Sequence, residues 1–245
     1  MSTLLAFELA TEACSVALLH DGRLLARHEV APRRHAELAL PWAEALLAEA
    51  GVAKSQLDAL AVGVGPGAFT GVRLAISLVQ GIALGLDRPV VPVSTLAALA
   101  EPFLAEGRVL AAIDARMGEL YVGEFEADAE RMPLPMAEEA LLPVGEAAAA
   151  LLARWPVTDP GRVGVGTGFA AGGAAWCAAL AGRLVRVEAE ALPTAAAVAR
   201  IAERSLGRGG AVAPERLEPT YLRDKVALTS AEQVAARAAK TGGAG

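Results

Sequence analysis

Apolar residues in the first hundred positions fall into two patterns. Short uninterrupted runs predict strands, and runs with a period near 3.6 predict helices. Asp21-Gly22 lies between two of the short runs and is typical of a tight hairpin turn, because glycine tolerates a positive φ. The patterns predict strands at residues 4–9, 15–19, 23–30, 59–64 and 90–93, and helices at 35–50 and 70–84.

The same kind of pattern begins again after residue 102. It predicts strands at 109–113, 120–125, 163–165 and 184–187, and helices at 146–154, 170–181 and 194–206. The early hairpin indicates mixed sheets in an α/β protein, whereas a doubly wound dinucleotide fold places a helix directly after its first strand. We expect two lobes, 1–102 and 103–228, with the end of the second returning to the first, and a flexible tail over 229–245. The weak similarity between the lobes is consistent with duplication.

The composition narrows the class of protein. The chain has 245 residues, of which 54% are hydrophobic and 20% charged, so it is not a disordered chain. Its two cysteines cannot build a disulfide scaffold, and its three histidines lack the i,i+4 spacing of a helical metal pair. The formal net charge of −6 argues against a free-standing, strongly basic nucleic-acid binder. We therefore expect a cytoplasmic protein without metal or thiol chemistry.

Three further local features lead to expectations. The uncharged run 163–182 has the length of a membrane span, but glycines break it into strand, turn and helix, so we expect no membrane contact. Cys14 is expected to be a small buried hydrophobe. His35 is expected to lie in solvent at the start of a helix.

The most distinctive local signal is a glycine-rich segment between a predicted buried strand and a predicted helix, Gly65-Pro66-Gly67-Ala68-Phe69-Thr70-Gly71. Two interpretations remain open. The glycines fit a tight turn that needs close packing, and they also fit an anion site at the start of a helix, where backbone N–H groups lack partners. No Lys-Ser or Lys-Thr follows, so the segment is not a Walker P-loop.

The helix after this segment is apolar nearly all round. Val72, Ile76 and Val79 lie on one face, and Leu74 and Leu78 lie on another. Such a helix is either buried on two sides or docks a partner. Both interpretations remain open.

Asp114 and Arg116 follow a predicted strand of the second lobe, and a second glycine loop lies at 164–168. The Asp–Arg pair fits a structural ion pair. The order of acidic first strand, hairpin and two glycine loops also suits a phosphate cleft of the actin, sugar-kinase and Hsp70 type. The residues expected to face a phosphate or nucleotide there are Gly65, Gly67, Thr70, Asp114 and Arg116. A small-molecule kinase with Asp114 as base is therefore an alternative function.

Five segments together resemble a known family. They are residues 10–17, 65–73, 93–96, 113–121 and 219–223, and they are similar to the TsaB (YeaZ) family of bacterial tRNA threonylcarbamoyladenosine biosynthesis proteins. The resemblance covers residues 3 to about 228. It implies an actin-like (ASKHA) fold and a role in making N6-threonylcarbamoyladenosine (t6A) at position 37 of tRNAs that read codons beginning with A.

The resemblance also implies that this chain is not the enzyme. The family is the non-catalytic paralogue of TsaD, whose His-x-x-x-His metal site would match Thr95 and Leu99 here; Leu99 has no donor atom. No catalytic or metal-binding residue is therefore expected, and a metallopeptidase is the least favoured alternative. ATP and a metal would belong to the complex of TsaD with the ATPase TsaE.

The resemblance implies partners as well. The helices at 35–50 and 70–84 would pair with TsaD in a heterodimer, or with a second copy in a homodimer; TsaE would dock on the TsaB–TsaD pair, and tRNA contact would be indirect. The expected interface residues are Leu38, Trp42, Leu46, Val72, Arg73, Ile76, Val79 and Gln80.

Two positions depart from the family pattern. Glu8 stands where Asp is usual, and Ala68 stands where Ser is usual. Both changes reduce the polar contacts available to a phosphate or cation. We therefore do not expect this chain itself to bind a nucleotide.

Overall fold

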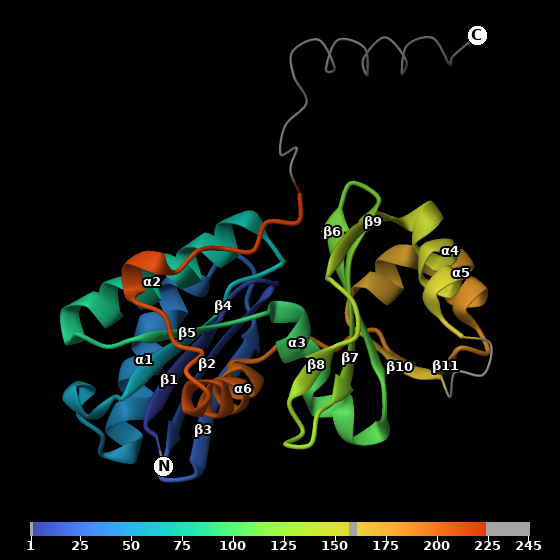
Figure 1. The fold of residues 1–245 in the computed structure, drawn as a ribbon. Coiled ribbons are helices and arrows are strands. Elements are labelled where there is room, and N and C mark those ends of the chain that lie inside the picture. The colour runs from blue at the N-terminus through green and yellow to red at the C-terminus, as the bar shows by residue number, and fades with distance from the viewer. Residues whose placement is uncertain (1, 157–160, 224–245) are drawn as a thin grey trace, which may run out of the picture.

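The computed structural model describes residues 2–156 and 161–223, which form two lobes side by side (Figure 1). The first lobe is built on a five-stranded mixed sheet in the order β3-β2-β1-β4-β5. Its central strand β1 is antiparallel to β2 and parallel to β4. The strands are β1 Leu4–Glu8, β2 Ala13–His20, β3 Arg23–Val30, β4 Ala59–Gly63 and β5 Val90–Val93.

The second lobe repeats this topology. Its sheet has the order β11-β10-β6-β7-β8, with β9 also paired to β7. The central strand β6 is antiparallel to β7 and parallel to β10, as β1 is to β2 and β4. The shared order supports duplication of one unit. The strands are β6 Val109–Arg116, β7 Glu119–Ala127, β8 Pro133–Pro135, β9 Ala140–Pro143, β10 Arg162–Val165 and β11 Leu184–Glu188.

Among the described residues, each half also carries three α-helices at matching places along the chain. In the first half they are α1 His35–Ala50, α2 Phe69–Leu86 and α3 Thr95–Ala100; in the second they are α4 Val144–Arg154, α5 Gly168–Leu180 and α6 Ala195–Gly207. Short 3₁₀ helices lie at η1 Lys54–Gln56, η2 Glu101–Glu106 and η3 Pro214–Arg216.

The third helix of each half packs on the sheet of the other half. Helix α6 lies on the first sheet, against β1, β2, β4 and β5, and α3 lies on β6 and β7 of the second (Figure 1). Alternate residues of β1 therefore face different helices. Leu4 and Ala6 join α3 and α6 in a core shared by both lobes, whereas Leu5 and Phe7 pack with α1 and α2. The shared core fixes one lobe against the other.

The predicted α/β class and the two-lobed, mixed-sheet fold are confirmed, with two local differences. The proline-rich stretch contributes the short strands β8 and β9. Helix α5 is broken at Gly173, whose φ of 70° is not helical. The limits at residues 102 and 228 remain a prediction, and the predicted tail lies outside the described residues.

Helix α2 is the one described helix that is long and apolar enough to cross a membrane. Its five buried residues pack on the first sheet, in the core shared with α1.

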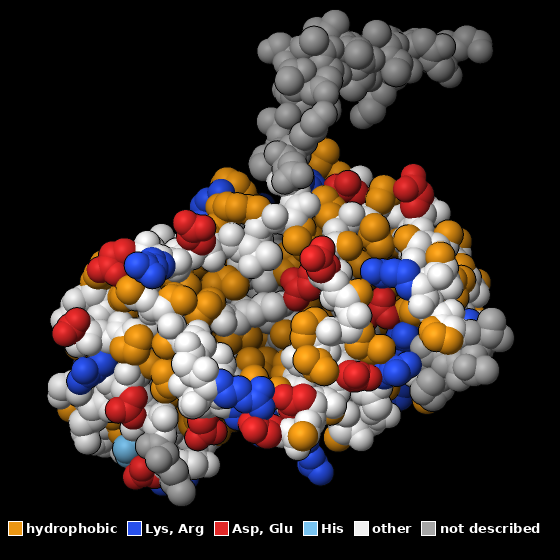
Figure 2. Space-filling model, in the orientation of Figure 1, with side chains coloured by type: hydrophobic (Ala, Val, Ile, Leu, Met, Phe, Trp, Pro, Cys, Tyr) orange, Lys and Arg blue, Asp and Glu red, His pale blue; other side chains and the backbone are white. Residues whose placement is uncertain are grey.

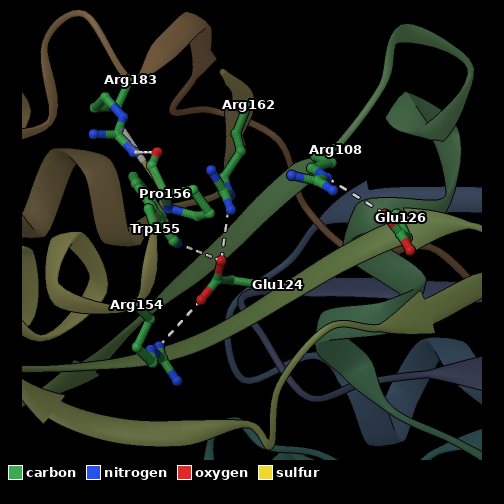
Figure 3. A network of polar contacts seen from close by, with 8 residues as sticks. All are labelled: Arg108, Glu124, Glu126, Arg154, Trp155, Pro156, Arg162 and Arg183. Atoms are coloured by element: carbon green, nitrogen blue, oxygen red, sulfur yellow. Dashed lines mark hydrogen bonds and ion pairs between the residues drawn. The ribbon is translucent and has the colours of Figure 1, made fainter. Parts of the chain in front are cut away.

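A buried polar network ties β7 to the end of α4 and to β10 (Figure 3). Glu124 is 4% exposed, and its Oε2 accepts a 2.5 Å hydrogen bond from the Trp155 indole N–H. The same oxygen lies 3.2 Å from Nε of Arg162, which is 2% exposed. The other oxygen, Oε1, lies 3.1 Å from Arg154. One carboxylate thus joins three segments of the second lobe.

We expect Glu124→Gln to lower the free energy of unfolding by about 3–5 kcal/mol, because it removes the charge that faces a buried guanidinium. The matched control is Glu126→Gln, two residues further along the same strand. Glu126 pairs with Arg108 near the surface, so its loss is expected to cost about 1 kcal/mol or less. Urea unfolding of both variants measures the difference; equal losses would contradict the assignment.

Candidate functional site

A cleft of about 1060 Å³ lies between the lobes, at the carboxyl ends of the central parallel strands. Both lobes contribute to it. The lining comes from segments 10–12, 32–36, 67–74, 113–116, 167–171 and 220–223, together with Tyr121. Of the residues predicted to face a phosphate, Gly67, Thr70, Asp114 and Arg116 line this cleft. Gly65 does not, because it is buried beneath the loop.

The glycine-rich loop is pressed against the chain that follows β1. A Cβ on Gly67 would lie 2.4 Å from the carbonyl oxygen of Ala10, and a Cβ on Gly71 would lie 2.1 Å from that of Leu9. The N–H of Ala68 donates to the Ala10 carbonyl at 2.7 Å. These contacts support the packing interpretation of the glycines. They leave the anion interpretation as a prediction.

The second glycine loop repeats the arrangement in the other lobe. A Cβ on Gly168 would lie 2.6–2.9 Å from atoms of Ala112 on β6. The N–H of Asp114 donates to the Thr167 hydroxyl at 3.2 Å. Each lobe therefore uses glycine to bring a helix start onto the end of its central strand.

Glu8 is fully buried below the first loop. Its Oε1 accepts a hydrogen bond from the Ala10 N–H at 2.8 Å, and its Oε2 accepts one from the Thr95 hydroxyl at 3.1 Å. Burial raises the pKa of this carboxyl from 4.5 to about 7, although the hydrogen bonds act in the opposite direction. A Cβ on Gly63 would lie 1.9 Å from Oε2, so a larger residue there would force the Glu8 carboxylate to move. Glu8 thus joins β1 to α3 and is not part of the cleft lining.

Asp114 and Arg116 form an ion pair of 2.9 Å at the turn between β6 and β7. The Arg116 N–H also donates to Asp114 Oδ1 at 2.8 Å. The Arg116 side chain is 81% exposed, whereas that of Asp114 is 24% exposed. The structural ion pair considered from the sequence is therefore present, and the Asp114 carboxylate is already occupied by neighbours of its own chain.

The prediction that His35 lies in solvent is wrong. His35 is 8% exposed, and its Nε2 lies 3.0 Å from the Thr11 carbonyl oxygen and 3.2 Å from that of Ala13. Both oxygens are acceptors, so Nε2 carries a proton and donates to them. The ring joins the start of α1 to the β1–β2 connection. Sequence spacing gave no signal of these carbonyl partners. Cys14 is fully buried, as predicted.

The predicted partner residues of α2 need correction. Val72, Ile76 and Val79 are at most 6% exposed and pack in the first lobe's own core; Leu46 of α1 does the same. They are covered by their own chain, because their face of each helix lies on the sheet.

The remaining predicted partner residues differ in how far they are engaged by their own chain. Leu38 and Trp42 are half-buried. Gln80 donates from its amide to the carbonyl oxygens of Pro214 and Leu217, at 3.0 and 3.2 Å, and so holds η3. Arg73 lies at the rim of the cleft.

The outward face of α2 is the apolar surface left open. Leu84 is 55% exposed, and Leu74, Leu78 and Ile82 are half-buried. Gly81 and Gly85 lie on the same helix, and no atom would come within 4 Å of a Cβ on either. Figure 2 shows broad hydrophobic areas between the charges on the visible face.

Two lobes of equal topology, joined by exchanged helices around a cleft, define the actin-like (ASKHA) class of proteins. Comparison with known proteins agrees. The TsaD family, described as tRNA N6-adenosine threonylcarbamoyltransferase, matches residues 28–231. The TsaB protein of Escherichia coli (strain K12), described as a tRNA threonylcarbamoyladenosine biosynthesis protein, is 40% identical over 232 residues, which cover 91% of this chain and 96% of the relative.

Further relatives point the same way. TsaB of Haemophilus influenzae is 48% identical over 126 residues, which cover 50% of this chain and 53% of the relative. The structure of YeaZ from Pseudomonas aeruginosa matches with a TM-score of 0.79 and 44% identity, over 91% of this chain and 100% of that chain. The chain belongs to the TsaB group of the TsaD family.

The glycine loop generates a stability prediction. Gly71→Ala is expected to lower the free energy of unfolding by about 1–3 kcal/mol, because the added methyl collides with the Leu9 carbonyl. The methyl group added by Gly81→Ala, on the same helix, would contact no other atom. This variant is expected to raise the free energy of unfolding by about 0.5–1 kcal/mol. Denaturant unfolding checks both signs, and a neutral Gly71→Ala would show that the loop is not closely packed.

Glu8 generates a pH prediction. Its folded-state pKa of about 7 lies above the 4.5 of the unfolded chain, so the folded chain keeps a proton that the unfolded chain loses. The contribution of Glu8 protonation to the free energy of unfolding is fully present below pH 4.5. It falls by about 3 kcal/mol as the pH rises to about 7. Glu8→Gln, which keeps the shape without the charge, should remove this decline.

The measurement is the free energy of unfolding of both proteins across this pH range. Subtracting one profile from the other cancels the other titrating groups, provided that the rest of the structure is unchanged. Parallel profiles would show that Glu8 does not titrate in this window.

Proposed function

We propose that this chain is the non-catalytic partner subunit of TsaD in the biosynthesis of t6A at position 37 of tRNAs that read codons beginning with A. The observation that carries the proposal is the apolar outward face of α2, together with membership in the TsaB group. The partner would cover this face and the neighbouring part of α1.

The two glycines of α2 support a close protein partner. Glycine inside a helix costs about 0.5–1 kcal/mol relative to alanine, and nothing in the described chain requires it at positions 81 or 85. A helix from another chain can approach most closely where side chains are absent. Half-buried Leu74, Leu78 and Ile82 would then complete the contact.

The positions that match the metal site of TsaD support a role without catalysis. Thr95 is fully buried, and its hydroxyl donates a hydrogen bond to the Glu8 carboxylate. Leu99 is 1% exposed and lies in the core shared by both lobes. Neither side chain faces the cleft, and Leu99 cannot bind a metal. Within residues 2–156 and 161–223, no three His, Cys, Asp or Glu side chains gather as a metal site requires. The residues present do not fit the metal group of the paralogue.

The remaining parts of the proposal follow from the same role. In the cytoplasm the chain would form a heterodimer with TsaD, and a homodimer through the same face when TsaD is absent. TsaE would dock on the pair, and ATP and the metal would be bound there rather than by this chain alone.

The test is co-purification with TsaD from the same organism. Leu84→Asp is expected to abolish co-elution in size exclusion, since it places a charge in the apolar contact while leaving the free fold intact. The control is Leu134→Asp on β8, a site 48% exposed in the other lobe, which should co-elute normally. Circular dichroism confirms that both variants fold. Normal pairing of Leu84→Asp, or intact t6A after loss of the gene, would refute the proposal.

A further inference from the structure

Two exposed aromatic rings and an arginine stack at the rim of the cleft. The guanidinium carbon of Arg73 lies 3.2 Å from the ring centroid of Phe69 and 4.8 Å from that of Tyr221. Both rings are 53% exposed, so each keeps surface open to solvent. Phe69 begins α2, whereas Tyr221 comes from the segment that crosses over the first lobe toward the second (Figure 1).

The charge of this rim is opposite to that of the whole chain. The chain carries a net charge of −6, yet the cleft lining includes Arg33, Arg73, Arg116 and Arg223 and only two carboxylates, Glu12 and Asp114. Arg223 is paired with Glu119 and Arg116 with Asp114. Among the described residues, Arg33 and Arg73 have no carboxylate within ion-pair distance.

We propose that this rim binds single-stranded RNA, with bases stacked on the open sides of Phe69 and Tyr221 and phosphates held by Arg33 and Arg73. Exposed aromatic rings beside a positive groove are the chemistry by which single strands are bound, since every base has a face that can stack. RNA loops present such unstacked bases, whereas duplex RNA does not. That the loop is the anticodon loop of a tRNA rests on the proposed function, and this direct contact departs from the indirect one that the family resemblance implies.

The charges favour RNA over a protein at this place. A protein partner of the apolar face of α2 needs no cluster of arginines, and two arginines without carboxylates gain most from a polyanion. The cleft also exceeds the needs of one nucleotide, so a strand of several nucleotides can enter its mouth. A protein partner covering the rim is the competing outcome of the test.

The experiment measures binding of a labelled anticodon stem-loop transcript, unmodified at position 37, to the full chain by fluorescence anisotropy at several salt concentrations. Tyr221→Ala and Phe69→Ala should each weaken binding about five-fold or more, because each removes one stacking surface. Tyr221→Phe keeps the ring and should bind like the unaltered chain. Leu134→Ala, on the exposed strand β8, is the matched control and should also bind normally.

Salt dependence tests the phosphate contact. Arg33→Gln should reduce the slope of log affinity against log salt by about 0.7, the value for one phosphate contact with a single strand. A fully paired duplex of the same length should bind less tightly than the stem-loop.

Three results would overturn the inference: no binding by the unaltered chain at low salt, equal binding by Tyr221→Ala and Tyr221→Phe, or normal RNA binding by both alanine variants with loss of TsaD co-elution. The last would assign the rim to the protein partner. Because TsaD pairing is measured separately through Leu84, failure of RNA binding leaves the proposed function standing.

Discussion

The exchange of helices between the halves is the constraint on which the rest of the structure depends. Each sheet, one of five strands and one of six, must be covered on two faces, and the described part of each half supplies two helices that stay on its own sheet. Helices α3 and α6 cover the remaining faces from the opposite half, so that one apolar core runs through both lobes. An ion pair beside this core adds to the contact between the helices: Arg200 of α6 donates two hydrogen bonds to Glu101 of η2. Separating the lobes would expose part of this core to water.

Much of the fold could be predicted from the sequence, because the strands are short apolar runs bounded by turn residues. The hairpin at Asp21-Gly22 and the restart after residue 102 were sufficient to predict two mixed sheets. The exchange of α3 and α6 could not be seen, since periodicity shows that a helix has an apolar face but not which sheet covers it. The strands β8 and β9 could not be predicted, because prolines stand at their ends and proline is typical of loops.

The site was predictable only in part, for related reasons. Helix α2 is apolar on nearly every face, so spacing could not distinguish the face on its own sheet from the face left open. Val72, Ile76 and Val79 were assigned to the wrong side, and the open side is marked instead by glycines that nothing in the chain requires. His35 was misplaced because its partners are backbone carbonyls, which leave no trace in a sequence. Of the residues predicted to face a phosphate, Gly67, Thr70, Asp114 and Arg116 do line one cleft, as the strand–loop–helix order indicated, and their contact with a phosphate stays a prediction.

The buried position of Glu8 withdraws its carboxylate from the cleft. A carboxylate at the end of the first strand could hold a cation that bridges to a phosphate, but Glu8 directs both oxygens inward, to the Ala10 N–H and the Thr95 hydroxyl. Ala68 adds no hydroxyl to the loop above it. The floor of the cleft thus offers little to a cation–phosphate pair, whereas Arg33 and Arg73 at its mouth have no carboxylate partner among the described residues. In the two proposals made above, a fold shared with kinases loses the chemistry of its floor and keeps two surfaces for binding, an apolar helix face and a basic aromatic rim.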